Sequence, residues 1–127
     1  MNRVILAGIL LCFTMSKVLA QDAVKVDPKH YKLELENAQV RVLRVHYGPH
    51  EKSVMHSHPD TVMTFLTDCK VKFTAPDGKS VERTAKAGEI MYSPADTHLP
   101  ENLSDKALEG ILVELKTKPK SGPPANK

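Results

Sequence analysis

Two histidines separated by one residue stand at the start of an apolar segment, His56 and His58 in "VMHSHPDTVMTFLTD". The segment has the composition of a β-strand, in which the side chains of residues i and i+2 point to the same side. The two imidazoles would therefore project together, and their nitrogens could bind one metal ion. Because such a pair also arises by coincidence on surface strands, a metal site requires a third ligand.

His98, in "SPADTHLPEN", is the candidate for that third ligand. The predicted cofactor is one divalent ion (Fe, Mn, Ni, Cu or Zn), among which the sequence does not choose. Of the other histidines, His50 is expected to be a loop residue at the surface or a base beside the site. His30 and His46 are expected to be structural or exposed.

The elements that must position these histidines are short segments rich in Val, Leu, Ile, Phe and Tyr, which begin at Tyr31 and are separated by turn residues. This pattern is typical of an all-β fold. Seven or so antiparallel strands have to close into a sandwich or barrel, because a single sheet would leave an apolar face in water. The chemistry is then expected in the mouth or lumen of the barrel.

Two of these strands carry irregularities that the pattern places at particular residues. In "AQVRVLRVHY" the apolar residues alternate only if the strand slips at Leu43. In "ALEGILVEL" the glycine Gly110 suggests a β-bulge.

The first 20 residues resemble a secretory signal peptide, with cleavage expected after Ala20. A retained anchor, a buried helix and a lipid on Cys12 remain less favoured alternatives, the last because Leu11 is large. We therefore expect a periplasmic or secreted product with a single domain at 21–116 and a disordered, Pro- and Lys-rich tail at 117–127.

Charge and cysteine content restrict the partners and the redox chemistry. Loss of Arg3 and Lys17 with the signal peptide would leave 16 basic and 15 acidic residues, which favours neither nucleic acid nor an anionic membrane as a partner. Cys69 would be the only remaining thiol, so no internal disulfide forms and a buried position is expected.

The sequence around the histidines resembles the two motifs of the cupin superfamily over residues 35–116. His56 and His58 match the histidine pair of the first motif, and the second motif is matched at Gly88, Pro94, His98 and Asn102. The resemblance implies a small antiparallel β-barrel of the jelly-roll or double-stranded β-helix type. It also implies that the three histidines bind a metal ion.

The chain departs from the family pattern at a fourth ligand, a glutamate. Its place is taken by Val62, or by Thr61 with a shorter spacing, so three neutral imidazoles are expected to hold the ion. Glu101 could replace the missing carboxylate, although a solvated loop position is favoured, and Asp60 is assigned to a turn. Histidine and aspartate stand where the motifs have glycine, at His50 and Asp96, and both residue types tolerate positive φ.

Three functions agree with these features. The first is a metal-dependent enzyme, oxygenase-like or isomerase-like, that acts on a small chelating organic molecule. The second is a cupin that binds a metal or small ligand without turnover. The third is a structural subunit whose barrel face forms a homodimer.

Overall fold

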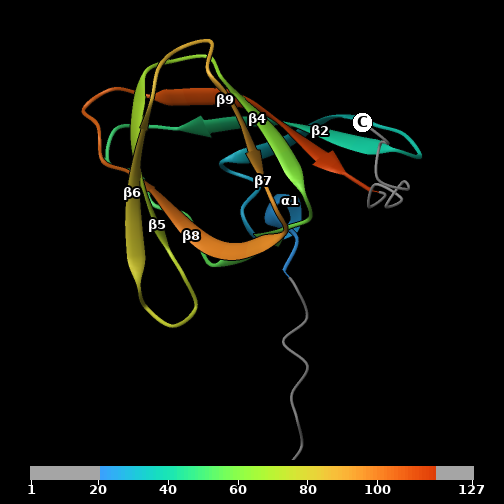
Figure 1. Cartoon of the computed structure of the whole chain (residues 1–127), viewed down its shortest axis with the longest axis horizontal. Coiled ribbons are helices and arrows are strands. Elements are labelled where there is room, and N and C mark those ends of the chain that lie inside the picture. The colour runs from blue at the N-terminus through green and yellow to red at the C-terminus, as the bar shows by residue number, and fades with distance from the viewer. Residues whose placement is uncertain (1–20, 117–127) are drawn as a thin grey trace, which may run out of the picture.

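The computed structural model describes residues 21–116, which form nine β-strands and one short helix (Figure 1). The all-β prediction is therefore confirmed. The predicted signal peptide at 1–20 and the predicted disordered tail at 117–127 lie outside the described residues. Within the described part of the chain, no helix is long and apolar enough to cross a membrane.

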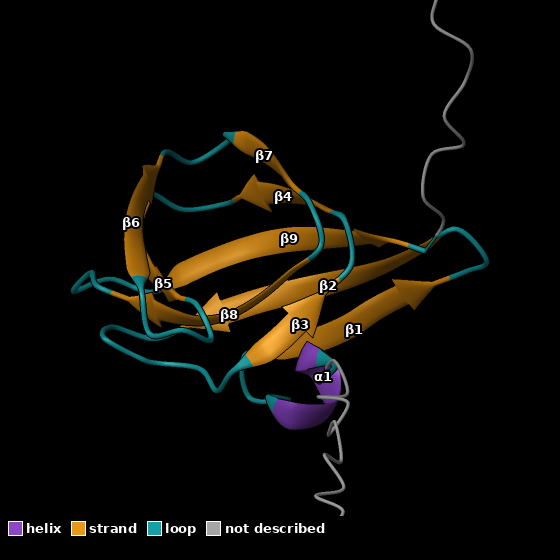
Figure 2. Ribbon diagram, turned by 60° about the horizontal axis from the view of Figure 1, so that its bottom comes forward, coloured by secondary structure: helices purple, strands orange, loops and turns teal. Residues whose placement is uncertain are grey.

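The strands form two antiparallel sheets that face each other and enclose an interior (Figure 2). Neighbouring strands are often distant in sequence, as in β2–β9 and β5–β8, so the chain crosses repeatedly between the sheets in the manner of a jelly roll. The five-stranded sheet has the order β1 (Tyr31–Glu36), β2 (Val40–Tyr47), β9 (Leu108–Leu115), β4 (Thr61–Phe65), β7 (Ile90–Ser93). The four-stranded sheet has the order β3 (His56–His58), β8 (Asp96–Asn102), β5 (Cys69–Thr74), β6 (Ser80–Ala85), and helix α1 (Ala23–Val26) precedes β1.

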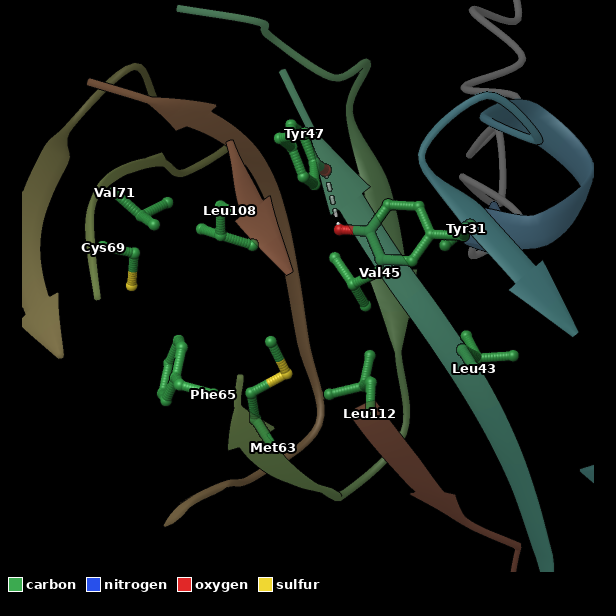
Figure 3. Packing of buried hydrophobic residues seen from close by; sticks show 11 residues of the cluster. Tyr31, Leu43, Val45, Tyr47, Met63, Phe65, Cys69, Val71, Leu108 and Leu112 are labelled. Carbon is green, nitrogen blue, oxygen red and sulfur yellow. Dashed lines mark hydrogen bonds between the residues drawn. The ribbon is translucent and has the colours of Figure 1, made fainter. Parts of the chain in front are cut away.

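The hydrophobic core lies between the sheets, where both contribute inward-facing side chains (Figure 3). Val45, Leu108 and Leu112 from the larger sheet face Val71 and Cys69 from the smaller one. Cys69 is 8% exposed, which confirms the predicted buried position, and it forms no disulfide with another of the described residues.

The expected slip in β2 and the expected bulge in β9 are both wrong. The two strands pair without interruption from Val40 opposite Leu115 to Tyr47 opposite Leu108. Side chains therefore alternate strictly along β2, and Leu43 faces the core at 0% exposure. The irregularity lies in β1 instead, where the register shifts between Leu33 and Leu35.

Gly110 serves close packing inside the regular strand β9. A Cβ atom at this position would lie 2.1 Å from Met63 Cε and 3.1 Å from the backbone oxygen of Thr64. Glycine thus allows Met63 of the neighbouring strand β4 to fill the core, which explains why a residue that weakens strands is found here.

Candidate metal centre

The pairing of β3 with β8 brings the three predicted ligands together. The two strands are antiparallel, with His56 directly opposite His98, and His58 stands two residues further along β3 on the same side. One nitrogen from each of the three rings lies within 4.8 Å of the others, against the roughly 3–4 Å expected for nitrogens around an ion. His56 is fully buried, His58 is 8% exposed and His98 is half-buried.

Hydrogen bonds fix the orientation of all three rings in the same sense. Nδ1 of His56 donates to the Val54 carbonyl oxygen at 2.8 Å, that of His58 to Glu114 Oε1 at 2.7 Å, and that of His98 to Asp96 Oδ2 at 3.2 Å. A neutral imidazole that donates from Nδ1 keeps an unprotonated Nε2 with a free lone pair. The Nε2 atom of His56 is buried and has no hydrogen-bond partner within residues 21–116. An unpaired buried acceptor of this kind fits a metal-ligand position, and the three histidines would together hold the ion.

The surroundings keep the histidines in the neutral form that a metal requires. Burial lowers the pKa of His56 from 6.5 to about 4, and the proximity of His58 contributes to the decrease. Burial also lowers the pKa of His98, again with a contribution from His58. Since only a neutral imidazole coordinates a metal, these shifts favour binding at neutral pH.

The pKa of His56 predicts that the metal-free protein loses stability as the pH falls from about 6.5 to about 4. In this window the unfolded chain binds a proton at His56 that the folded protein excludes, so acid favours unfolding. The contribution is about 3 kcal/mol, at 1.36 kcal/mol per pKa unit. Urea unfolding of chelator-treated protein at several pH values measures it, and His56→Gln should flatten the dependence in this window. An equally steep dependence in His56→Gln would contradict the assignment to His56.

Glu114 on β9 is a functional candidate that the sequence analysis missed. Its side chain is 2% exposed and accepts the proton of His58 Nδ1. Its second oxygen lies 3.1 Å from Arg41 Nη1, although without hydrogen-bond geometry, and the same Arg41 nitrogen bonds Asp22 at 2.9 Å. The alternation of side chains along β9 could have indicated the inward position of Glu114, since every second residue faces the interior: Leu108, Gly110, Leu112 and Glu114.

The prediction that Val62 faces the metal site is wrong. Strand β3 ends at His58 and β4 begins at Thr61 in the other sheet, so the side-chain alternation changes phase between them. Thr61 and Met63 consequently face the interior, at 5% and 8% exposure, and line the cavity described below. Val62 lies on the outer face, opposite Val113.

Val62→Glu is therefore expected to leave metal affinity unchanged within about twofold, as for a substitution on an outer surface. Thr61→Glu is the matched variant, because it places the same carboxylate on the inner face, where it could add a charged ligand. Competition titration against a chromogenic chelator measures both affinities. If Val62→Glu binds the metal more tightly than the wild type and Thr61→Glu does not, then residue 62 faces the metal.

The other polar residues near the site have structural partners. Glu101 points away from the histidines and pairs with Lys72 at 2.7 Å, so it does not replace the missing ligand. Asp60 accepts from Ala95 N at 2.9 Å, in agreement with its predicted role in a turn. His50 is an exposed loop residue at positive φ, as expected, and contacts Asp105.

Asp96 does not adopt the positive φ that its alignment with glycine suggested. It is the first residue of β8, opposite His58, and it orients His98 as described above.

A buried polar network extends from His56 to the surface. Ser53 Oγ lies 3.2 Å from His56 Nδ1 and donates to Asp27. Asp27 contacts His30 Nδ1 at 2.7 Å, and His30 Nε2 contacts Glu51 at 2.9 Å. His30 is 5% exposed, so it has the structural role that the sequence analysis considered. The network braces the segment that precedes the ligand strand β3.

The histidines adjoin a cavity of about 370 Å³, a size typical of small-molecule sites. Side chains from both sheets line it, and most of them are apolar. His58 and His98 are part of its wall, with the hydroxyl-bearing residues Tyr31 and Thr61 nearby in the lining. A ligand in this cavity would thus contact the candidate metal ligands His58 and His98 among mostly apolar side chains.

Comparison with known proteins agrees with this architecture. The family model described as "Cupin domain" matches residues 43–114. A cupin domain protein of Bordetella pertussis Tohama I is 24% identical with a TM-score of 0.64, over 68% of this chain and 92% of that chain. An RmlC-like cupin of Methanocaldococcus jannaschii is 18% identical with a TM-score of 0.52, over 70% and 83%.

A predicted oxalate decarboxylase of Thermotoga maritima is 22% identical with a TM-score of 0.50, over 67% of this chain and 77% of that chain. No curated protein matches the sequence. The likeness to the solved structures establishes the fold, while the family match extends from β2 to β9 and includes all three histidines. The chain therefore belongs to the cupin family.

Proposed function

We propose that this chain is an exported metal-dependent cupin enzyme, oxygenase-like or isomerase-like, that acts on a small chelating organic molecule. The observation that carries the proposal is the set of three histidines with one common orientation, among them the buried and unpartnered Nε2 of His56. Their position beside an apolar cavity of about 370 Å³ supports a small organic substrate.

The donor set defines the chemistry available at such a site. A divalent ion bound by three neutral imidazoles keeps its full charge and supplies Lewis-acid chemistry toward an anionic chelating ligand. The lining is mostly apolar, so a bound ligand would displace water from it, and electrostatic interactions with that ligand would be stronger than in water.

Tyr31 is a further polar group available to the ligand. Its ring packs edge-on against His56, with 4.9 Å between the ring centroids, and its hydroxyl accepts a hydrogen bond from Tyr47 at 2.8 Å. Burial raises the pKa of Tyr31 well above its ordinary value, so the phenol keeps its proton and is able to donate it in a hydrogen bond to a ligand oxygen.

The test separates an enzyme from a binder. Untagged protein from its native compartment is analysed for metals and then offered O₂ and a panel of β-diketones, enediols, catechols and oxalate. An oxygenase consumes O₂ with the matching substrate, an isomerase forms product without O₂, and both activities disappear in His98→Ala. Ligand-induced changes in the metal spectrum without turnover of any compound would establish the binding function and overturn the enzyme.

Export is tested separately by the intact mass of the secreted or periplasmic product, which should begin at Gln21, with or without cyclisation. A cut before this residue is compatible with the fold, in which Gln21 O accepts from Ser57 N at 2.7 Å and Asp22 pairs with Arg41. Cleavage after Ala20 would keep both contacts. A mature chain that retains Met1, or that carries a lipid on Cys12, would contradict the proposal.

A further inference from the structure

Arg83 interrupts a row of apolar side chains on the inner face of the smaller sheet. In the antiparallel pair β5–β6, Val71 lies opposite Arg83 and Phe73 lies opposite Val81. Directly opposed residues share a face of the sheet, and Val71 is a core residue at 5% exposure. Arg83 is thus on the inward-facing row, and it is part of the cavity lining. The strand pattern favours an apolar residue at this position.

No carboxylate of residues 21–116 neutralises Arg83. Arg41 pairs with Asp22 and Arg44 pairs with Glu34, whereas Arg83 takes part in no ion pair or side-chain hydrogen bond within that range. The adjacent Glu82 points to the other face and pairs with Lys70 at 2.9 Å. The guanidinium is therefore available for an anionic group from outside the protein.

The charges around the cavity are compatible with this role. Among the described residues, Arg83 and Asp96 are the only ones in its lining that carry a fixed charge, and Asp96 accepts from His98. Because β6 is an edge strand and Arg83 is exposed, its guanidinium is accessible from solvent as well as from the cavity. An anion that enters the cavity along the β6 edge would therefore contact Arg83 before it reaches the three histidines.

We propose that Arg83 binds a carboxylate of the ligand, so that the site selects small organic acids whose chelating oxygens and carboxylate lie at opposite ends. The assumption that the other end of this ligand chelates a metal ion rests on the proposed function above. A guanidinium presents a planar fork of donors that matches a carboxylate with two parallel hydrogen bonds. Because Arg83 is exposed, salt screens its charge, and the paired hydrogen bonds of the fork supply the selectivity.

The experiment compares catechol with 3,4-dihydroxybenzoate, which share a chelating head and differ in one carboxylate. Isothermal titration of the metal-loaded protein is expected to show that the acid binds about tenfold more tightly than catechol. This preference should decrease as salt is added, because salt screens the charge of Arg83. Arg83→Gln should abolish this preference without changing the affinity for catechol. Arg83→Lys should retain only part of it, because the ammonium lacks the fork. Arg44→Gln, which removes an exposed arginine of the other sheet, is the matched control and should preserve the preference.

A second arm does not depend on the metal. Benzoate, but not benzamide, is expected to shift the Arg83 Nε resonance of the metal-free protein, and the benzoate affinity should decrease in Arg83→Gln. Equal binding of the acid and catechol by the wild type, or a preference that survives Arg83→Gln, would overturn the role of Arg83. If catechol fails to bind the metal-loaded protein, the chelating head assumed for the ligand is wrong, and the benzoate arm still decides the role of Arg83.

Discussion

Replacing His98 with alanine is expected to weaken the binding of a divalent metal by more than about 100-fold. Loss of a residue that only orients a ligand costs about 10–100-fold in affinity, so loss of a direct ligand should exceed that range. His98 is the most suitable of the three histidines for this test because it is half-buried, whereas His56 is fully enclosed in the core. Competition titration with a chelator and metal analysis of the purified protein measure the effect.

His46→Ala is the matched control for this prediction. His46 lies on β2 with its side chain 52% exposed and contacts Glu109 at the surface, so its loss should leave metal affinity unchanged. Circular dichroism and thermal unfolding of both variants establish that the barrel is intact. If His98→Ala binds metal as tightly as His46→Ala does, then the three histidines do not form the site.

The sequence predicted the clustering of the histidines for sound physical reasons. The spacing of His56 and His58 places both on one side of a strand whatever its partner is, because that depends only on local backbone geometry. The approach of His98 depends on the pairing of two strands that are distant in the sequence. Only the resemblance of the second motif indicated it, since strand pairing cannot be read from one segment.

The error at Val62 has a different cause. The sequence analysis placed Val62 at the site from the spacing of the family motif, in which a ligand follows the histidine pair, but in this chain Pro59 and Asp60 end the strand after His58. At this point the chain passes from the smaller sheet to the larger one, and the inward-facing parity changes. A proline is a local signal for such a break, but the resulting change of parity follows only from the arrangement of the two sheets.

The prediction of which β2 side chains face the interior was also wrong, because it rested on their hydrophobicity alone. Val40 and Val42 are apolar but lie on the outer face, while the inner face carries Arg41 together with Leu43 and Val45. Hydrophobic periodicity fails where a charged pair faces the interior, because it assigns charged residues to the solvent-facing side of a strand. The inward position of Arg41 and Glu114 could therefore be recognised only in the structure, where the two side chains lie 3.1 Å apart across the β2–β9 pair.

Arg41 and Glu114 connect the N-terminal segment to the candidate metal site. Asp22 and Glu114 share the Arg41 guanidinium, and Glu114 in turn holds His58 Nδ1–H. The alternation of negative and positive groups compensates for the burial of Glu114, which would be costly in isolation. A carboxylate behind a metal-bound histidine also fixes the ring orientation and raises the basicity of Nε2.

Glu114→Gln is accordingly expected to weaken metal binding by about 10–100-fold and to destabilise the metal-free barrel by about 1–3 kcal/mol, because Arg41 keeps its hydrogen bonds to Asp22. The amide oxygen can still accept from His58, so the orientation of the ring is partly kept while the negative charge is lost. Arg41 then lacks one of its two closest carboxylates in a partly buried position. Metal affinity is measured well below the unfolding temperature, and stability by urea unfolding.

Glu109→Gln separates this effect from a general loss of charge on β9. Glu109 belongs to the same strand, but it is exposed and contacts His46 at the surface, so its substitution should change neither metal affinity nor stability appreciably. A second variant, Arg41→Gln, removes the counter-charge and keeps Glu114. It should destabilise the protein similarly but weaken metal binding less than Glu114→Gln does, because the carboxylate that polarises His58 remains. If both variants lower metal affinity equally, Glu114 acts through the stability of the barrel and not through His58.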